Sequence, residues 1–236
     1  RAAPVNGASV EISAPPVGGR TRLGNILAPA SLKHPGLTGV YPLAHPQSAF
    51  AARALLAGAA DRTVDIQNYI WRADETGFLL LEALWQAAER GVKVRLLLDD
   101  INTGGLDPTL AALYTHPNIE VRLYNPLFHR SFRIINYITD FSRVNRRMHN
   151  KAMTVDGAAT ILGGRNVGNE CFGQGEGVLF EDLDVLAVGA TPPLVEKSFE
   201  LYWASPAAYP VTQLVQPADD AVAKLRAAGI TPIAVG

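Results

Sequence analysis

Short apolar runs typical of strands alternate along this 236-residue chain with stretches in which apolar residues recur at helical spacing. The predicted strands cover residues 63–71, 92–98 and 119–124. The predicted helices cover residues 48–60, 75–90 and a shorter stretch that begins at Asp107. Strands joined by helical crossovers predict a mainly parallel sheet with helices on both faces.

The second half of the chain carries more closely spaced strands. Residues 151–155 and 158–162 are separated by Asp156-Gly157, a dipeptide that favours a two-residue hairpin turn. The other elements predicted there are a helix near 130–142, a strand over 179–188 and a helix over 192–203. Together these patterns predict an α/β fold with a mixed sheet.

The two ends of the chain differ from the middle. Residues 1–45 contain scattered Pro and Gly and little periodicity, so we expect an irregular N-terminal arm. Residues 46–205 would then form the main lobe. Residues 206–236 begin with several prolines, and we expect a linker followed by a short Ala-rich helix over 218–229.

Composition excludes several classes of protein. With 48% hydrophobic residues, 18% charged residues and a net charge of −1, the chain should fold into a globule rather than coat a polyanion. A single cysteine excludes an intramolecular disulfide framework. No apolar run approaches the roughly 18 residues that a membrane-spanning helix needs, and no signal-peptide pattern is visible near the first residue.

His149 and Lys151 are the first candidates for a reacting site. Alternate side chains of a strand share a face, so these two would point the same way. An imidazole beside an ammonium group suits a phosphate, because the lysine supplies charge to the oxygens and the histidine can act as nucleophile or proton donor. The plainer interpretation is an ordinary hydrogen-bonded histidine beside a solvated lysine.

The residues just past the hairpin add to this candidate site. Gly163 and Gly164 are small enough to let backbone or substrate approach closely. Asn166 offers an amide as a third phosphate ligand, although asparagine here could also be a simple turn residue.

The segment 129–166 is locally basic, with seven basic against two acidic residues. A focused positive patch on a nearly neutral protein suits an anionic substrate. Arg146, Arg147, Arg165 and Tyr69 are candidate substrate-binding residues. For Arg146 and Arg147, a surface or lipid-headgroup contact is the simpler interpretation, and Tyr69 could equally pack in the core.

This spacing resembles the His-Lys-Asp signature of the phospholipase D superfamily, with the Gly-Ser-x-Asn element that follows it. The residues that carry the pattern are His149, Lys151, Asp156, Gly163, Gly164 and Asn166. Residues 38–205 are also similar to the first half of bacterial cardiolipin synthase-like members. The resemblance implies a phospholipase D-like α-β-α sandwich with a mixed, largely parallel sheet.

The family implies a role for each matching residue. His149 would form a covalent phosphohistidine or act as the general acid, while Lys151 and Asn166 would hold the phosphoryl oxygens. Asp182 would orient the histidine by accepting its second ring N–H. Asp156 would be mainly architectural. No metal or other cofactor is implied.

Two departures from the family pattern stand out. Gly164 occupies a position where many members have serine, which removes one hydroxyl contact to phosphate. The family also needs two such motifs facing each other, yet no other histidine of this chain has lysine two residues on. We therefore expect either a symmetric pair of chains or a first lobe that is followed by a second, and the linker-like tail favours the second arrangement.

The activity implied is phosphatidyl transfer or phosphodiester hydrolysis on phospholipids such as phosphatidylglycerol, in a bacterial protein attached peripherally to a membrane. One alternative is a phosphodiesterase or endonuclease that works as a homodimer, for which nucleic acid would be the substrate. Another is a lobe that binds anionic lipid without catalysis. Nucleic acid is the less favoured partner.

Overall fold

The computed structural model describes residues 21–130, 144–174 and 182–215. These residues form one eight-stranded sheet in the order β1-β7-β6-β5-β2-β3-β4-β8. The strands are β1 (Thr38–Leu43), β2 (Thr63–Asn68), β3 (Lys93–Asp99), β4 (Ile119–Tyr124), β5 (Ala152–Val155), β6 (Ala159–Gly163), β7 (Asp184–Gly189) and β8 (Ala208–Pro210). The helices are α1 (Arg22–Lys33), α2 (Pro46–Ala59), α3 (Glu75–Glu89), α4 (Asp107–Leu113) and α7 (Thr191–Trp203).

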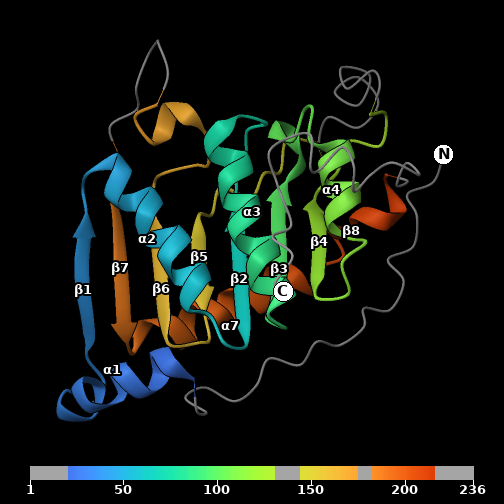
Figure 1. The fold of residues 1–236 in the computed structure, drawn as a ribbon. Helices are drawn as coiled ribbons and strands as arrows, with labels where there is room; N and C mark the ends of the chain where they lie inside the picture. Colours follow the sequence, from blue (N-terminus) through green and yellow to red (C-terminus); the bar gives the residue numbers. More distant parts are fainter. Residues whose placement is uncertain (1–20, 131–143, 175–181, 216–236) are drawn as a thin grey trace, which may run out of the picture.

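The helices form layers on the two faces of the sheet (Figure 1). One face is covered by α2, α3 and α4, and the opposite face by α7, while α1 lies below the lower end of the sheet beside β7. The predicted α-β-α sandwich is therefore confirmed.

The sheet is mixed, as predicted, but it is less parallel than expected. Only β2–β3 and β3–β4 are parallel, and the other five pairings among the described strands are antiparallel. The reason is that the β5–β6 hairpin lies between β2 and β7. The expectation of a largely parallel sheet was wrong because the pattern of helical crossovers continues only as far as β4.

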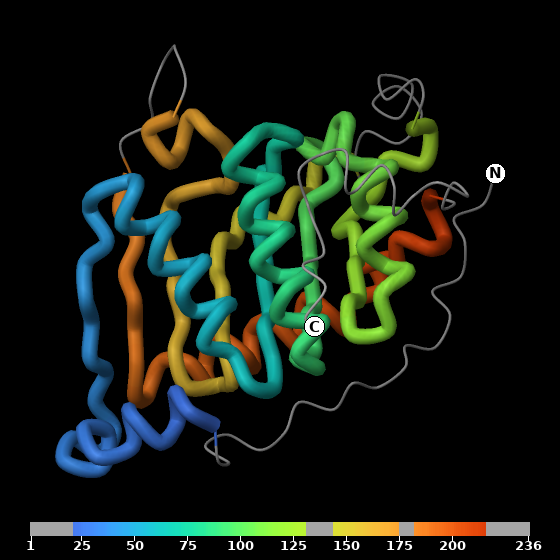
Figure 2. The backbone as a smooth tube through the Cα atoms, viewed as in Figure 1, coloured from blue at the N-terminus to red at the C-terminus, as the bar shows by residue number. Residues whose placement is uncertain are grey.

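The N-terminal arm is also more regular than expected, since α1 and β1 fall within residues 1–45. Thr21 caps α1, its hydroxyl accepting a hydrogen bond from the Gly24 N–H at 3.0 Å. β1 owes its regularity to β7, about 150 residues later in the chain, with which it pairs throughout. Figure 2 shows the two segments side by side at one edge of the sheet. A local sequence pattern cannot predict a partner strand so far away in the chain.

In the predicted linker, β8 adds a short strand to β4. The predicted Ala-rich helix over 218–229 and nearly all of the helix near 130–142 lie outside the described residues. The limits of the predicted lobe, residues 46–205, remain a prediction.

The core differs between the two faces of the sheet. Under α3 it is apolar and rich in leucine, including Leu80, Leu84 and Leu96. Under α7 it contains a buried ion pair, in which two guanidinium nitrogens of Arg95 each lie 2.7 Å from an oxygen of Asp65. The guanidinium group also lies 4.8 Å from the ring centre of Phe199 on α7. This paired geometry is what allows two charges in the middle of the sheet.

Asp156 fixes the hairpin that precedes the candidate site. It and Gly157 have φ angles of 54° and 62°, as a two-residue hairpin turn of this kind requires. The Asp156 carboxylate accepts hydrogen bonds from the backbone N–H groups of Asp61, Arg62 and Thr63 at 3.0, 2.8 and 2.9 Å. One side chain thereby joins the β5–β6 turn to the start of β2.

We expect Asp156→Ala to lower the free energy of unfolding by about 2–4 kcal/mol, because three backbone N–H groups, one of them buried and two partly buried, lose a charged acceptor. Asp156→Asn should cost less, since asparagine keeps one acceptor oxygen and tolerates a positive φ. Urea unfolding of both variants measures the difference. An alanine variant as stable as the wild type would contradict this role.

Candidate active site

Four strand ends meet at the upper edge of the sheet in Figure 1. They are the end of β2, the start of β5, the end of β6 and the start of β7, as the pairings Gln67↔Ala152, Ala152↔Leu162 and Gly163↔Asp184 show. All the residues that the sequence proposed as catalytic lie on the segments that leave these ends.

His149 and Lys151 lie together, as the sequence predicted, although β5 begins only at Ala152 and they precede it. The Lys151 Nζ lies 3.3 Å from each ring nitrogen of His149 and donates to the His149 carbonyl at 2.9 Å. The histidine is exposed, whereas Lys151 is only 6% exposed. The pair therefore offers an accessible imidazole next to a sheltered amine.

Tyr69, just past the end of β2, completes this group. Its ring centre lies 4.6 Å from that of His149 and 5.2 Å from the Lys151 Nζ. The tyrosine thus contacts both candidate residues, and it is half-buried rather than in the core. A cation near an aromatic face gains modest electrostatic stabilisation.

Asn166 lies on the neighbouring segment. Its Oδ1 accepts a hydrogen bond from the Ile70 N–H at 3.1 Å, and the next residue, Val167, donates to the Ile70 carbonyl at 3.0 Å. These bonds hold Asn166 beside the residue that follows Tyr69. The turn-like contact and a phosphate contact can coexist, because the amide nitrogen of Asn166 has no partner among the described residues.

Gly163 and Gly164 let the chain before β7 pass close to the end of β6. A Cβ atom at Gly163 would lie 2.5 Å from the Leu183 carbonyl oxygen and 2.6 Å from the Asp184 Cα, so no side chain fits there. A Cβ at Gly164 would collide with the Asp182 carboxylate. Glycine at the position where many family members have serine is thus matched here by the placement of Asp182.

Asp182 also acts on the lysine electrostatically. Burial lowers the pKa of Lys151, and the negative charges of Asp182 and Asp184 oppose that change, Asp182 most strongly. The Asp182 carboxylate accepts a hydrogen bond from the Leu183 N–H at 2.9 Å. No hydrogen bond joins it to His149 among the described residues, so its orienting role remains a proposal.

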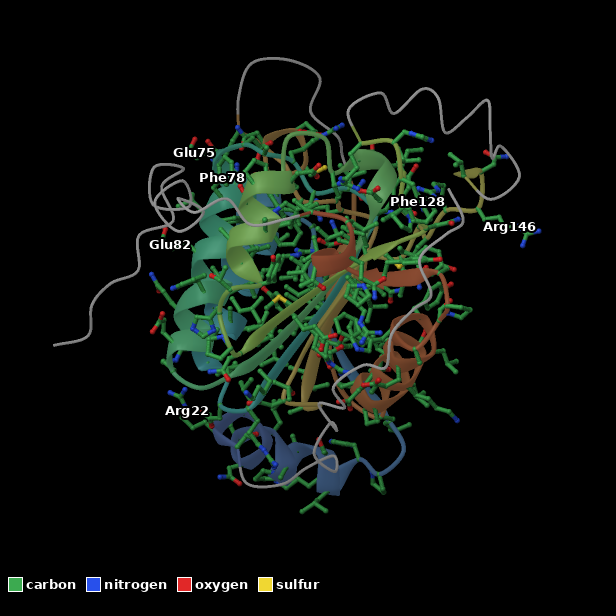
Figure 3. The ribbon with its side chains drawn as sticks, turned by 90° about the vertical axis from the view of Figure 1, so that its right-hand side faces the viewer. Arg22, Glu75, Phe78, Glu82, Phe128 and Arg146 are labelled. Carbon is green, nitrogen blue, oxygen red and sulfur yellow. The ribbon has the colours of Figure 1, made fainter. Side chains whose placement is uncertain are left out.

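The three arginines proposed for substrate binding occupy different environments. Arg165 is buried and donates to the carbonyls of Leu43 and Ala44, at 2.9 and 2.6 Å, so it ties β1 to the end of β6 and does not face a substrate. Arg147 is paired with Asp99 at 2.9 Å. Arg146 alone is exposed and extends away from the body of the protein (Figure 3).

Two buried acidic residues that the sequence did not assign to the site support it. Asp184 is fully buried and accepts from the Arg53 guanidinium at 2.9 Å and from the Arg165 N–H at 3.2 Å, immediately before Asn166. Burial lowers the pKa of Arg53, and Asp184 opposes this. The alternation of Asp182 and Asp184 with apolar residues was the available signal, but it is equally typical of a solvent-facing strand.

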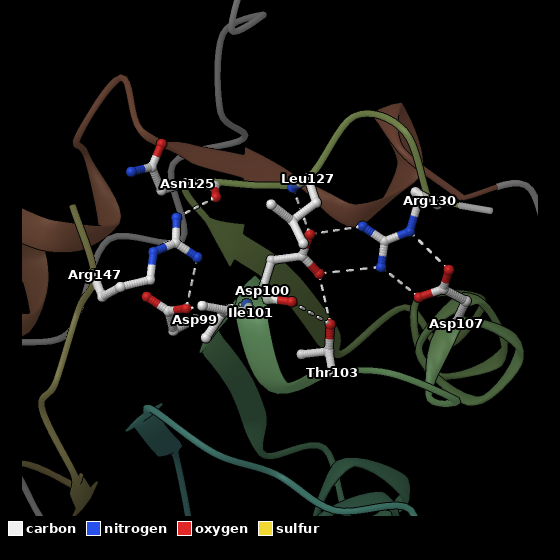
Figure 4. A network of polar contacts seen from close by, with 9 residues as sticks. All are labelled: Asp99, Asp100, Ile101, Thr103, Asp107, Asn125, Leu127, Arg130 and Arg147. Carbon is white, nitrogen blue, oxygen red and sulfur yellow. Dashed lines mark hydrogen bonds and ion pairs between the residues drawn. The ribbon is translucent and has the colours of Figure 1, made fainter. Parts of the chain in front are cut away.

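Asp99 is the second of these residues, at the end of β3 (Figure 4). It is fully buried, and this burial raises its pKa to about 6. Its carboxylate accepts from the N–H groups of Met148 at 2.8 Å and Ile101 at 3.0 Å, besides pairing with Arg147. Asp99 therefore contacts the two residues that precede His149.

Comparison with known proteins agrees with this architecture. The family model described as "Cardiolipin synthase, PLD-like domain" matches residues 54–181. Cardiolipin synthase C of Escherichia coli K12 is 52% identical over 194 residues, which make up 82% of this chain and 41% of that protein. An uncharacterized protein of Helicobacter pylori 26695 is 35% identical over 199 residues, 82% of this chain and 39% of its own length. The chain thus spans about two fifths of the length of these relatives.

Solved structures share the fold at low sequence identity. The phosphatidylserine synthase of Haemophilus influenzae Rd KW20 has a TM-score of 0.55 at 15% identity, and the match covers 80% of this chain and 42% of that one. NucT from Helicobacter pylori has a TM-score of 0.53 at 18% identity, covering 74% of this chain and 98% of that one. With a family model that matches more than half of its residues and carries the motif segment, the chain belongs to the cardiolipin synthase, phospholipase D-like domain family.

Proposed function

We propose that this lobe carries one half of the active site of a phosphatidyltransferase of the cardiolipin synthase type. The observation that supports it most directly is the position of the Lys151 Nζ, 3.3 Å from both ring nitrogens of the exposed His149. A nucleophile that can reach solvent next to a sheltered amine is the arrangement that attack on a phosphodiester needs. The 52% identity to cardiolipin synthase C supports the lipid substrate.

In the first step of the proposed reaction, His149 attacks the phosphorus of phosphatidylglycerol. A P–N bond forms, the P–O bond to glycerol breaks, and the departing oxygen takes a proton from the histidine of a second motif. Lys151 and the Asn166 amide would bind the non-bridging oxygens and stabilise the charge that develops on them. Asp182 would hold the proton on the other ring nitrogen of His149.

In the second step, the hydroxyl of another phosphatidylglycerol attacks the phosphohistidine. The P–N bond breaks, the hydroxyl proton passes to the second histidine, and cardiolipin forms. Water in place of the alcohol gives hydrolysis by the same route. The overall change is two phosphatidylglycerol molecules to one cardiolipin and one glycerol.

The second motif is supplied from elsewhere in this proposal. Two arrangements are compatible with the fold: another lobe of a longer chain, or a second copy of this one. The two solved structures also differ in length relative to this lobe. The match covers 42% of the phosphatidylserine synthase chain but 98% of the NucT chain. A symmetric pair would place equivalent histidines on opposite sides of one phosphate.

We further propose a bacterial protein that acts at a membrane surface. No helix in the described part of the chain is long and apolar enough to cross a bilayer. Among the described residues, Arg146 is the one best placed to bind an anionic headgroup, because it is exposed and its side chain extends into solvent from the motif segment. The endonuclease alternative and the lipid-binding alternative remain as outcomes of the tests below.

The first prediction of this proposal tests His149 with a substrate that does not require a second motif. An activated phosphodiester such as bis(4-nitrophenyl) phosphate releases a leaving group that departs as an anion and needs no general acid. We expect one equivalent of nitrophenolate and a phosphoryl adduct on His149, located by peptide mass spectrometry. His149→Ala should lose the adduct and slow release by roughly 10⁴-fold or more, and a wild-type sample without an adduct on His149 would contradict the proposal.

A second prediction tests the substrate. Where sedimentation shows a pair of chains, which would supply both motifs, phosphatidylglycerol vesicles incubated with the protein should yield cardiolipin and glycerol in equal amounts. Hydrolysis to phosphatidic acid would indicate a phospholipase instead. Cleavage of single-stranded DNA without any lipid product would support the endonuclease, and vesicle binding that His149→Ala retains without turnover in either protein would support a binding lobe.

The third prediction concerns pH. Asp182 raises the pKa of Lys151, so removing its charge in Asp182→Asn should lower that pKa further. Lys151 then loses its proton at a lower pH, and the alkaline limb of the pH–rate profile should move to lower pH. In Lys151→Arg the limb should vanish, because guanidinium does not titrate in this range. An alkaline limb that stays in place in Asp182→Asn would contradict the electrostatic link.

A further inference from the structure

We propose that Asp99 is a positioning residue of the active site: by binding the backbone and side chain of the two residues before His149, it sets the place from which the imidazole attacks. This inference rests on the proposed function, since it assigns Asp99 a part in the reaction of His149. It adds a residue from β3, a strand that contributes none of the residues of the His-Lys-Asp motif.

The contacts of Asp99 all lead to its own strand end or to the motif segment. One carboxylate oxygen accepts from the Met148 N–H at 2.8 Å, and the other receives the Arg147 guanidinium at 2.9 Å and the Ile101 N–H at 3.0 Å. The carboxylate is fully buried. Charge-assisted hydrogen bonds out of contact with water are short and directional, so they restrict the segment they hold.

Asn125 makes a second connection to the same segment (Figure 4). The Arg147 guanidinium donates to the Asn125 carbonyl at 2.7 Å, and the Asn125 amide donates to the Arg146 carbonyl at 2.6 Å. Gln67 on β2 adds a contact of 3.0 Å from its amide to the Met148 sulfur. Residues 146–148 are therefore held from both β2 and the ends of β3 and β4.

His149 itself lacks comparable support. It is exposed, and its described side-chain contacts are the ring of Tyr69 and the amine of Lys151. Its backbone lies between Met148, which Asp99 holds, and Ala152, which pairs with Gln67. The position of the imidazole is therefore determined on its N-terminal side by Asp99.

The neighbouring carboxylates provide a matched control. Asp100 and Asp107 bind Arg130 from the same network, and Asp100 also accepts from the Leu127 N–H at 2.7 Å. Neither carboxylate contacts residues 146–149. Asp107→Asn therefore removes a charge from the network without touching the motif segment, whereas Asp99→Asn removes one from its direct support.

The experiment compares these two variants with the wild type by two independent measurements. The first is the rate of adduct formation on His149 with bis(4-nitrophenyl) phosphate. The second is the NMR spectrum of ring-labelled histidine, in which His149→Gln identifies the His149 signal. We expect Asp99→Asn to slow adduct formation by roughly 10- to 100-fold and to shift or broaden the His149 signal, while Asp107→Asn matches the wild type in both. The signal of His116, a buried residue between α4 and β4, should stay unchanged and serves as the internal reference.

A folded Asp99→Asn protein with the wild-type rate and the wild-type His149 signal would overturn the proposal. So would an Asp107→Asn variant with the same losses, because the effect would then belong to the network as a whole. If Asp99→Asn does not fold, Arg147→Lys takes its place. Lysine keeps the charge, but its single amine cannot bind both the Asp99 carboxylate and the Asn125 carbonyl as the guanidinium group does. An unchanged His149 signal in that variant would also contradict the proposal.

The two proposals fail in distinguishable ways. A wild-type protein that forms no adduct on His149 contradicts the proposed function, yet the NMR comparison still shows whether Asp99 controls the environment of the ring. An active wild type with an unaffected Asp99→Asn variant contradicts the positioning role alone.

Discussion

The arrangement at the sheet edge depends on the hydrogen bonds and ion pairs that the buried Asp184 carboxylate makes. Its charge can remain at the start of β7 because Arg53 of α2, the Arg165 backbone N–H and, at 3.7 Å, the Arg165 guanidinium group compensate it. Arg165 in turn donates to the carbonyls of Leu43 and Ala44, at the end of β1. One charge thus joins a helix and three strands, and it does so next to Asn166. Removing Arg53 would leave this buried charge without its shortest ion pair, which is costlier than the loss of one surface contact.

Buried carboxylates play the same part at two other strand ends. Asp156 binds three N–H groups at the start of β2, and Asp99 binds the N–H of Met148 at the end of β3. Each of these acidic residues holds the main chain rather than a substrate. The candidate reacting groups are therefore carried on segments whose backbone is held by buried carboxylates, while the imidazole of His149 stays exposed. Such support is what a nucleophile needs if its geometry is to be reproducible.

The sheet topology explains why the candidate residues of the proposed site gather at one edge of this lobe. The β5–β6 hairpin inserts between the parallel strands and β7, so the motif segment enters at the same edge where β2 and β6 end. Tyr69, His149, Lys151 and Asn166 gather there from three parts of the chain. In the proposed reaction, all of them would approach a phosphate from one side. In the proposed reaction the proton for the leaving group must come from the opposite side, where a second motif would lie.

Local patterns in the sequence determined most of the elements and singled out His149 and Lys151 as the candidate reacting pair. The period of the apolar residues identified α2, α3, β3 and β4 closely, and the Asp156-Gly157 turn located the hairpin. The spacing of His149 and Lys151 indicated phosphate chemistry. Only the tertiary structure decided that β1 pairs with β7, that the sheet is mainly antiparallel, that Arg165 is buried in a structural role, and that Asp99 reaches Met148. Each of these depends on partners far apart in the chain, and the local pattern around a residue carries no information about which distant backbone will satisfy its charge or its hydrogen bonds.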